Sequence, residues 1–187
     1  MTPEYSKSLI LVWRIAEIEA RHLKSSTIEP AHLLLGLCKV VDLDLSALVS
    51  KDIPQRDTVL EELLHEVRRV KNVFRIAGLN AKTFRRRLRQ SVADPLLALS
   101  DLNRIHRSQA AKKVFTDAEH LAALDDSDVF PAHLLYALLL VKNDKLDITF
   151  RDLGISEYDF QTAAKREALF HGRSRAITSS KGRSHRN

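Results

Sequence analysis

The chain has 187 residues, a length that suits one domain and is sufficient to bury a hydrophobic core. Hydrophobic residues make up 44% and charged residues 29% of the sequence, proportions typical of a soluble globular protein. No apolar run approaches the roughly 18 residues of a membrane helix, and the N-terminus lacks the features of a signal peptide. The single cysteine, Cys38, excludes an internal disulfide, so we expect a cytoplasmic protein with no membrane anchor and a buried thiol.

The first predicted helix begins at Thr2-Pro3-Glu4, where a capping residue is followed by a proline and an acid. Its apolar face holds, at helical spacing, Leu9, Val12, Trp13, Ala16, Ala20 and Leu23. The residues Ser25-Ser26-Thr27 end this helix, and a second helix begins within the stretch Ile28–Leu37. Because the second helix is apolar on most of its circumference, we expect it to be buried.

Three more helices are predicted before the middle of the chain. A short one lies at Asp42–Leu48, and a longer one runs from Pro54 to a glycine stop at Gly78. The longer helix carries an apolar stripe made of Leu60, Leu63, Leu64, Val67, Val70, Phe74 and Ala77. The third runs from an Asn80 cap to about residue 93, before a turn at Asp94-Pro95.

The second half of the chain opens with a predicted helix near Ser108. Its inward face holds Ala111, Val114, Phe115, Ala118, Leu121 and Ala122. The acidic loop Asp125–Asp128 follows, and then a second apolar stretch, Val129–Leu138. A short helix begins at Asn143, and a last helix is predicted over about residues 156–170.

The stretches Ile28–Leu37 and Val129–Leu138 are two copies of one pattern, 101 positions apart. Such a unit cannot cover its own apolar faces, so we expect the two copies to pack as a pseudo-symmetric pair. Each copy has a histidine in the first helical turn, His32 and His133. A catalytic pair of His32 with Cys38 is excluded, because six residues on a helix separate them by about 240°. We interpret both histidines as neutral side chains that pack and hydrogen-bond at the turn.

The residues His32-Leu33-Leu34 with Leu37, and His133-Leu134-Leu135 with Leu138, resemble a family pattern, Thr-Glu-His-Ile/Leu-Leu-x-x-Leu. The family is the double Clp-N repeat, the all-helical domain at the N-terminus of the Clp ATP-dependent unfoldases, and 111–114 and 153–156 are also similar to it. The resemblance implies an all-α fold of two pseudo-symmetric repeats with about four helices each. It makes the following residues a structural signature: Pro30, His32, Leu33, Leu34, Pro131, His133, Leu134 and Leu135.

The segment between the repeats departs from the family, whose joint is a short loop. We place repeat one at residues 3–65, a basic helical insert at 66–104 and repeat two at 105–170, so that the Clp-N-like domain spans residues 1–170. Residues 171–187 contain five Lys or Arg and no acid, among Ser and Gly. This composition predicts a disordered basic tail.

The insert is dense in positive charge, with nine Lys or Arg and one acid between His65 and Gln90. The helical face could simply be solvated, or it could bind an acidic protein or nucleic acid. We predict partner binding by Arg75, Lys82, Arg85, Arg86, Arg87 and Arg89. The centre of this group is Arg85, Arg86, Arg87 and Arg89, and replacing these four by Glu is expected to abolish binding without unfolding the domain.

No motif predicts catalysis or a cofactor. The chain has no phosphate-binding loop and no histidines at metal-ligand spacing, and the loop at 125–128 lacks the glycine and the glutamate of a calcium site. Because the ATPase modules of the Clp unfoldases are absent from the sequence, the resemblance implies a non-catalytic protein-binding module, an adaptor or accessory factor of a Clp-type unfoldase or protease. Its partners would be a Clp ATPase or protease subunit or a substrate protein. The alternative is a nucleic-acid-associated protein that uses the insert and the tail.

The resemblance also bears on one ligand. Some relatives bind phosphorylated arginine through the Glu that precedes the signature His in each repeat, and here these positions are Ala31 and Ala132. Without either carboxylate, we expect that recognition of phosphoarginine is lost.

Overall fold

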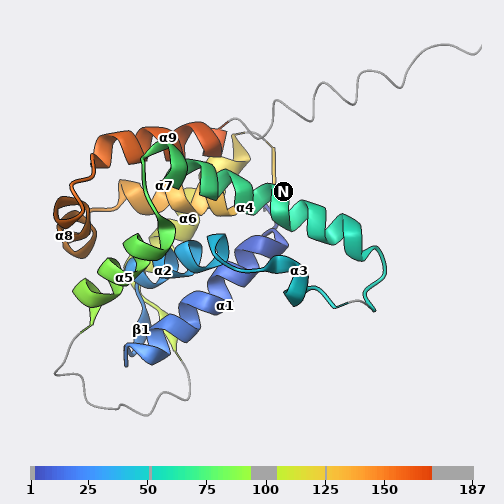
Figure 1. The fold of residues 1–187 in the computed structure, drawn as a ribbon, viewed down its shortest axis with the longest axis horizontal. Coiled ribbons are helices and arrows are strands. Elements are labelled where there is room, and N and C mark those ends of the chain that lie inside the picture. Colours follow the sequence, from blue (N-terminus) through green and yellow to red (C-terminus); the bar gives the residue numbers. More distant parts are fainter. Residues whose placement is uncertain (1–2, 51, 94–104, 125, 170–187) are drawn as a thin grey trace, which may run out of the picture.

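The computed structural model describes residues 3–50, 52–93, 105–124 and 126–169 (Figure 1). The helices in this part of the chain are α1 (Lys7–His22), α2 (Pro30–Val41), α3 (Leu45–Leu48), α4 (Arg56–Ile76), α5 (Ala81–Val92), α6 (Gln109–Ala123), α7 (Pro131–Leu140), α8 (Asp144–Asp152) and α9 (Glu157–Leu169). Two strands of two residues each, β1 (Thr27–Ile28) and β2 (His106–Arg107), complete the described elements. The predicted all-α fold is therefore confirmed. No described helix is both long and apolar enough to cross a membrane.

The first helix begins later than the sequence suggested. α1 starts at Lys7, and the hydroxyl of Ser6 accepts the N–H of Leu9 as its cap. The residues before Ser6 are extended, because they pair with the chain that leads into α7. The N–H of Val129 donates to the carbonyl of Glu4 at 2.7 Å, and the N–H of Ser6 donates to the carbonyl of Val129 at 3.1 Å. The predicted start at Thr2-Pro3-Glu4 was wrong for this reason.

The same hydrogen-bonded pairing occurs a second time, with the two halves of the chain in exchanged roles. β1 and β2 pair in parallel, and the N–H of Ser108 donates to the carbonyl of Ile28 at 3.1 Å. Ser108 then caps α6 by accepting the N–H of Ala111, as Ser6 caps α1. Each half therefore anchors the start of its first helix on the segment that precedes the signature helix of the other half. This exchange produces the pseudo-symmetric pair that the internal repeat predicted.

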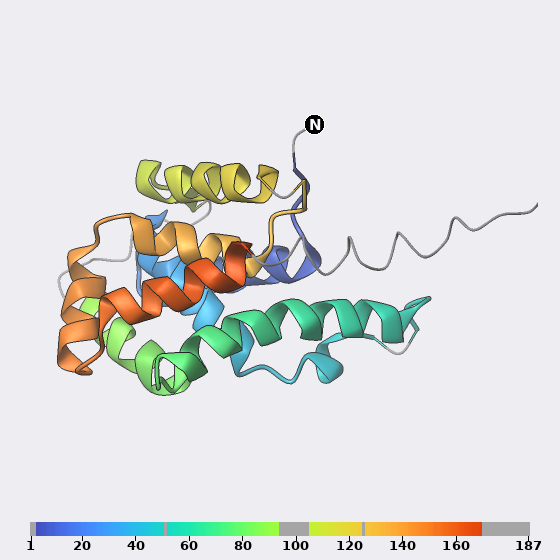
Figure 2. The same cartoon turned by 90° about the horizontal axis from the view of Figure 1, so that it is seen from above.

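The two signature helices form the centre of the core. α2 packs against α1 and α5, and α7 packs against α6 and α9. Four phenylalanines join the two halves, with ring centroids 5.2 to 6.0 Å apart: Phe74, Phe84, Phe150 and Phe160. Figures 1 and 2 show that the N-terminal half of α4 extends beyond this body, with α3 beside it.

A second repeated motif appears once the turns are compared. Phe74 and Phe150 each precede a turn whose glycine has a positive φ, 66° at Gly78 and 65° at Gly154. In both turns the N–H of the residue after the glycine donates to the phenylalanine carbonyl, at 2.8 Å for Leu79 and 2.9 Å for Ile155. This hydrogen bond, with a glycine in the left-handed region, is a common helix end. The match makes α4 the counterpart of α8, and α5 the counterpart of α9.

The spacing of the two motifs shows where the first half is longer. The signatures lie 101 positions apart, but these turns lie only 76 apart, so the first half has 25 more residues between its signature and its turn. Most of the extra residues fall in α3, in the connection that follows it and in the first part of α4. The match thus favours a division in which α5 belongs to the first repeat, whereas the predicted boundaries place it in an insert at 66–104. Residues 94–104 of that segment, and the predicted tail at 171–187, lie outside the described residues.

Candidate functional site

The signature histidines have equivalent positions. Each is 1% exposed, and its Nδ1 accepts the N–H of the residue that caps the same helix, from Glu29 at 2.9 Å for His32 and from Phe130 at 3.2 Å for His133. The prolines of the signature are the first residues of α2 and α7, and the four leucines are buried. The signature residues thus lie within the core, and the histidines have the packing and hydrogen-bonding geometry expected of them.

The two histidines differ at the other ring nitrogen. Because Nδ1 accepts a hydrogen bond, a neutral ring carries its proton on Nε2. Nε2 of His133 donates to the carbonyl of Ala168 at the end of α9, at 3.0 Å. Nε2 of His32 is buried and has no hydrogen-bond partner among the described residues. Burial lowers the pKa of His32, and it raises the pKa of the Cys38 thiol in the same helix. Both groups are therefore neutral core residues at physiological pH.

The six cations predicted to bind a partner, here called the basic surface, lie on the last turn of α4 and along α5. α5 buries Ala81, Phe84 and Leu88, so its cations spread over the remaining sides of the helix. Arg75, Lys82 and Arg86 are exposed and form no hydrogen bond or ion pair with another described residue. Lys82 and Arg86 are four residues apart and so neighbour each other on the helix. These three cations are available to a partner.

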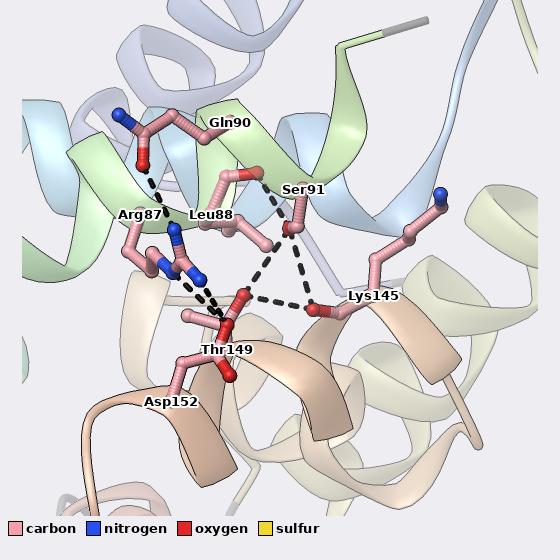
Figure 3. A network of polar contacts seen from close by, with 7 residues as sticks. All are labelled: Arg87, Leu88, Gln90, Ser91, Lys145, Thr149 and Asp152. Atoms are coloured by element: carbon pink, nitrogen blue, oxygen red, sulfur yellow. Dashed lines mark hydrogen bonds and ion pairs between the residues drawn. The ribbon is translucent and has the colours of Figure 1, made fainter.

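Arg87 is used within the fold. Its Nε and Nη2 both approach one carboxylate oxygen of Asp152 at the end of α8, at 3.0 and 2.5 Å (Figure 3). One turn further along α5, the hydroxyl of Ser91 lies 3.2 Å from that of Thr149 and 3.4 Å from the carbonyl of Lys145, both in α8. These contacts fasten α5 to α8, so the Arg87 guanidinium is already partnered.

Arg89 also has an internal partner, on α1. Its Nη2 lies 2.6 and 2.5 Å from the two carboxylate oxygens of Glu19, and its Nε lies 3.1 Å from one of them. Glu19 is only 4% exposed, and no other described cation forms an ion pair with it. A bidentate arginine is well suited to stabilise a carboxylate of this kind. Arg89 therefore holds α5 against α1.

Arg85 is half-buried. Its Nη1 is buried and has no hydrogen-bond partner among the described residues, and its charge acts on the Cys38 thiol of α2. Its counterpart in the second half is Gln161, whose side-chain amide donates to the carbonyl of Leu139 at 3.2 Å. Leu139 is in turn the counterpart of Cys38. A neutral amide thus occupies, in one half, the position that a cation occupies in the other.

This comparison predicts the effect of replacing Arg85 by Gln. Arg85→Gln removes a partly desolvated charge with an unpaired donor, and such a donor costs about 1 to 3 kcal/mol when buried. We expect the free energy of unfolding, measured by urea denaturation, to stay the same or rise by about 1 kcal/mol. Arg86→Gln is the matched control on the exposed side and is expected to change it by less than about 0.5 kcal/mol. A clear loss for Arg85→Gln alone would mean that this guanidinium stabilises the fold.

A hollow of about 580 Å³ lies next to the basic surface. It is bounded by the end of α2, the start of α3, and the turn between α4 and α5. Its lining combines the apolar Leu43 and Leu79 with the cations Lys71 and Arg75, and also includes Asp42 and Asp44. The surface therefore offers both charge and an apolar recess.

The exposed cations and this hollow lie on one domain, which is built from two interlocked helical repeats. Solved structures with the same fold are known. The N-terminal domain of Hsp104 from Candida albicans matches with a TM-score of 0.58 and 18% identity, over 86% of this chain and 89% of its own. The N-terminal domain of the caseinolytic protease associated chaperone ClpD from Arabidopsis thaliana matches with a TM-score of 0.55 and 18% identity, over 87% and 96%. A structure described as "Preliminary structural investigations of a malarial protein secretion system" matches with a TM-score of 0.56 and 19% identity, over 88% and 95%.

These similarities identify the class of the protein: an all-helical domain built from two interlocked repeats. Within it, the chain has the fold of the N-terminal domains of Clp and Hsp104 chaperones, which confirms the resemblance found in the sequence signatures. At these identities the likeness establishes the fold. No family model and no curated protein sequence matches the chain. Among the described residues, no group of three or more His, Cys, Asp or Glu could hold a metal ion.

Proposed function

We propose that this chain is a non-catalytic protein-binding module that serves a Clp-type unfoldase or protease as an adaptor or accessory factor. The observation that carries the proposal is the match to N-terminal domains of chaperones over more than four fifths of the chain, one of them from a chaperone associated with a caseinolytic protease. An adaptor of this kind would bind a Clp ATPase or protease subunit on one surface and a substrate protein on another.

The basic surface is the contact that we propose for an acidic protein segment. Arg75, Lys82 and Arg86 are exposed, and Arg75 also lines the hollow beside them. An acidic segment could pair with these cations while an apolar side chain enters the hollow between Leu43 and Leu79. Arg87 and Arg89 are instead paired with Asp152 and Glu19, and these ion pairs help to fix the position of α5.

The test is affinity capture from a lysate of the source cells, with and without nuclease. We expect recovery of a Clp ATPase or protease subunit that does not depend on nuclease. In the variant Arg75→Glu, Lys82→Glu, Arg86→Glu, we expect binding of the recovered partner to weaken at least tenfold, because three attractive contacts become repulsive.

The matched control reverses three exposed cations on other helices, Arg14, Lys112 and Lys165, and is expected to bind normally. Recovery of nucleic-acid-binding proteins that disappears with nuclease would favour the alternative, and affinity would then fall steeply with salt. Equal binding by both triple variants would remove the basic surface from the proposal while leaving the adaptor role to another face.

A further inference from the structure

A groove of about 780 Å³ lies on another part of the molecule, away from the basic surface. Three segments line it: the chain before α1, the first half of α4, and the residues that lead into α7. Its described lining includes five carboxylates and two basic side chains other than histidine, so it is strongly acidic. The carboxylates are those of Glu4, Glu61, Glu62, Glu66 and Asp128, and the cations are Lys7 and Arg68.

One carboxylate of this groove lacks a cation. Glu66 is 9% exposed and accepts a hydrogen bond from the Ser8 hydroxyl, but no described Lys or Arg forms an ion pair with it. Lys7 pairs instead with Glu62, at 3.4 Å. Loss of hydration raises the pKa of Glu66, and the charges of Glu62 and Asp128 add to that effect. The groove thus has an excess of negative charge that a bound cation would offset.

The last described helix is directed toward this groove. α9 runs antiparallel to α4: the residues around its start, Ser156 and Asp159, line a pocket with Ile76, at the end of α4. Near the end of α9, the guanidinium of Arg69 donates to the carbonyl of Glu167. Glu66 is three residues before Arg69, so the end of α9 lies next to the acidic turns of α4.

The segment that follows has the complementary charge. Residues 171–187, which lie outside the described part of the chain, contain Arg173, Arg175, Lys181, Arg183 and Arg186 and no acid. From Arg69 back to Glu61 is about 12 Å along the helix, at 1.5 Å per residue. Residues 171–187, if fully extended, span up to about 56 Å. The segment is therefore long enough to reach every carboxylate of the groove.

We propose that residues 171–187 bind in the acidic groove of their own chain, with arginine and lysine side chains on the carboxylates of Glu61, Glu62, Glu66 and Asp128. Covalent attachment next to the groove favours this occupant over a separate basic peptide, because it sets a high effective concentration. The exposed Leu64 adds apolar surface for Ile177, the large aliphatic residue of the segment.

The test uses the full chain with a nitroxide spin label on a new cysteine, Ser179→Cys. The native Cys38 is fully buried and its thiol pKa is raised by burial, so the label reacts at position 179. In ¹⁵N-labelled protein, we expect selective broadening of the amide signals of residues 61–66 and of Asp128 at low salt. The broadening should disappear in about 0.5 M NaCl, because salt at that level screens exposed charges over a few ångströms.

Two matched variants decide whether the acidic groove is responsible. Glu61→Gln with Asp128→Asn, both in the groove, should reduce the broadening at least twofold, while Glu157→Gln with Asp159→Asn, at the exposed start of α9, should leave it unchanged. Equal effects of the two variants, or even broadening over the whole surface, would overturn the proposal. Broadening of an unlabelled ¹⁵N chain mixed with the spin-labelled chain would show that a second copy is the occupant, which also overturns it. None of these readings depends on a Clp partner.

Discussion

Replacing Gly36 by Ala is expected to lower the free energy of unfolding by about 2 kcal/mol, although alanine is the better helix former. A Cβ at this position would lie 2.6 Å from the carbonyl oxygen of Val12 and 3.2 Å from the amide nitrogen of Ala16, both in α1. These atoms belong to the backbone of a helix, so they cannot turn aside as a side chain can. α1 and α2 would have to separate, and the buried residues between them would lose contact.

The second half of the chain provides the control for this prediction. Ala137 occupies the corresponding position in α7, where a methyl group is accommodated, and it is fully buried. Ala137→Gly is expected to cost about 1 kcal/mol through helix propensity and the loss of a packed methyl group. Urea denaturation of both variants measures the two effects, and the melting temperature of Gly36→Ala should fall by about 4 to 8 °C. Stability equal to that of the unchanged protein would mean that the two helices can shift apart at little cost.

The repeated signature made the fold predictable because it combines a proline, a histidine and an apolar helix in a fixed order. The Pro30 and Pro131 stretches could be matched without gaps, and most apolar stripes predicted from the sequence proved to be buried. One exception is Leu64, which is 43% exposed and lines the acidic groove. It lies in the part of α4 that extends past the core, a position that helical spacing alone does not reveal.

The predicted extent of the first repeat, residues 3–65, stays a prediction, and spacing explains why the sequence does not show how its turns correspond to those of the second repeat. The turns after Phe74 and Phe150 share a phenylalanine, an arginine and a glycine at the same spacing, but their offset is 76 positions, whereas the signatures are offset by 101. In α5, the dense arginines surround two residues that are fully buried, Phe84 and Leu88. Charge density is a property of the sequence, whereas the burial of a helix depends on what packs against it.

The basic surface shows the same limit at the level of single residues. The sequence predicts six cations as one binding group; that they bind a partner stays a prediction, and the proposed contact uses three of them. The structure divides them, because Arg87 and Arg89 have acidic partners on α8 and α1 while Lys82 and Arg86 have none among the described residues. Ion pairs between residues 65 and 70 positions apart cannot be foreseen from local sequence. Asp152 and Glu19 carried no signal that would have linked them to α5.

Replacing Arg89 by Ala is expected to lower the free energy of unfolding by about 3 kcal/mol, because it leaves the carboxylate of Glu19 buried without a cation. The side chain of Glu19 is 5% exposed, and that of Arg89 is 46% exposed. Water that enters the space left by the arginine would offset part of the loss, which keeps the expected value at the lower end of the range for a broken buried pair. Urea denaturation near neutral pH is the measurement, with Arg86→Ala as the control expected to change stability by less than about 0.5 kcal/mol.

The second substitution Glu19→Gln separates the charge from the packing. If the loss arises from an uncompensated carboxylate, the double variant Glu19→Gln, Arg89→Ala should recover at least half of the stability lost by Arg89→Ala. If the double variant recovers none of the lost stability, the loss arises instead from the packing contacts of the arginine side chain.

The same reasoning changes what is expected of the four-arginine replacement. With Glu at position 89, two carboxylates would meet where the Arg89–Glu19 ion pair now joins α5 to α1. We therefore expect Arg85→Glu, Arg86→Glu, Arg87→Glu, Arg89→Glu to unfold the domain, whereas reversal of Arg75, Lys82 and Arg86 should leave it folded.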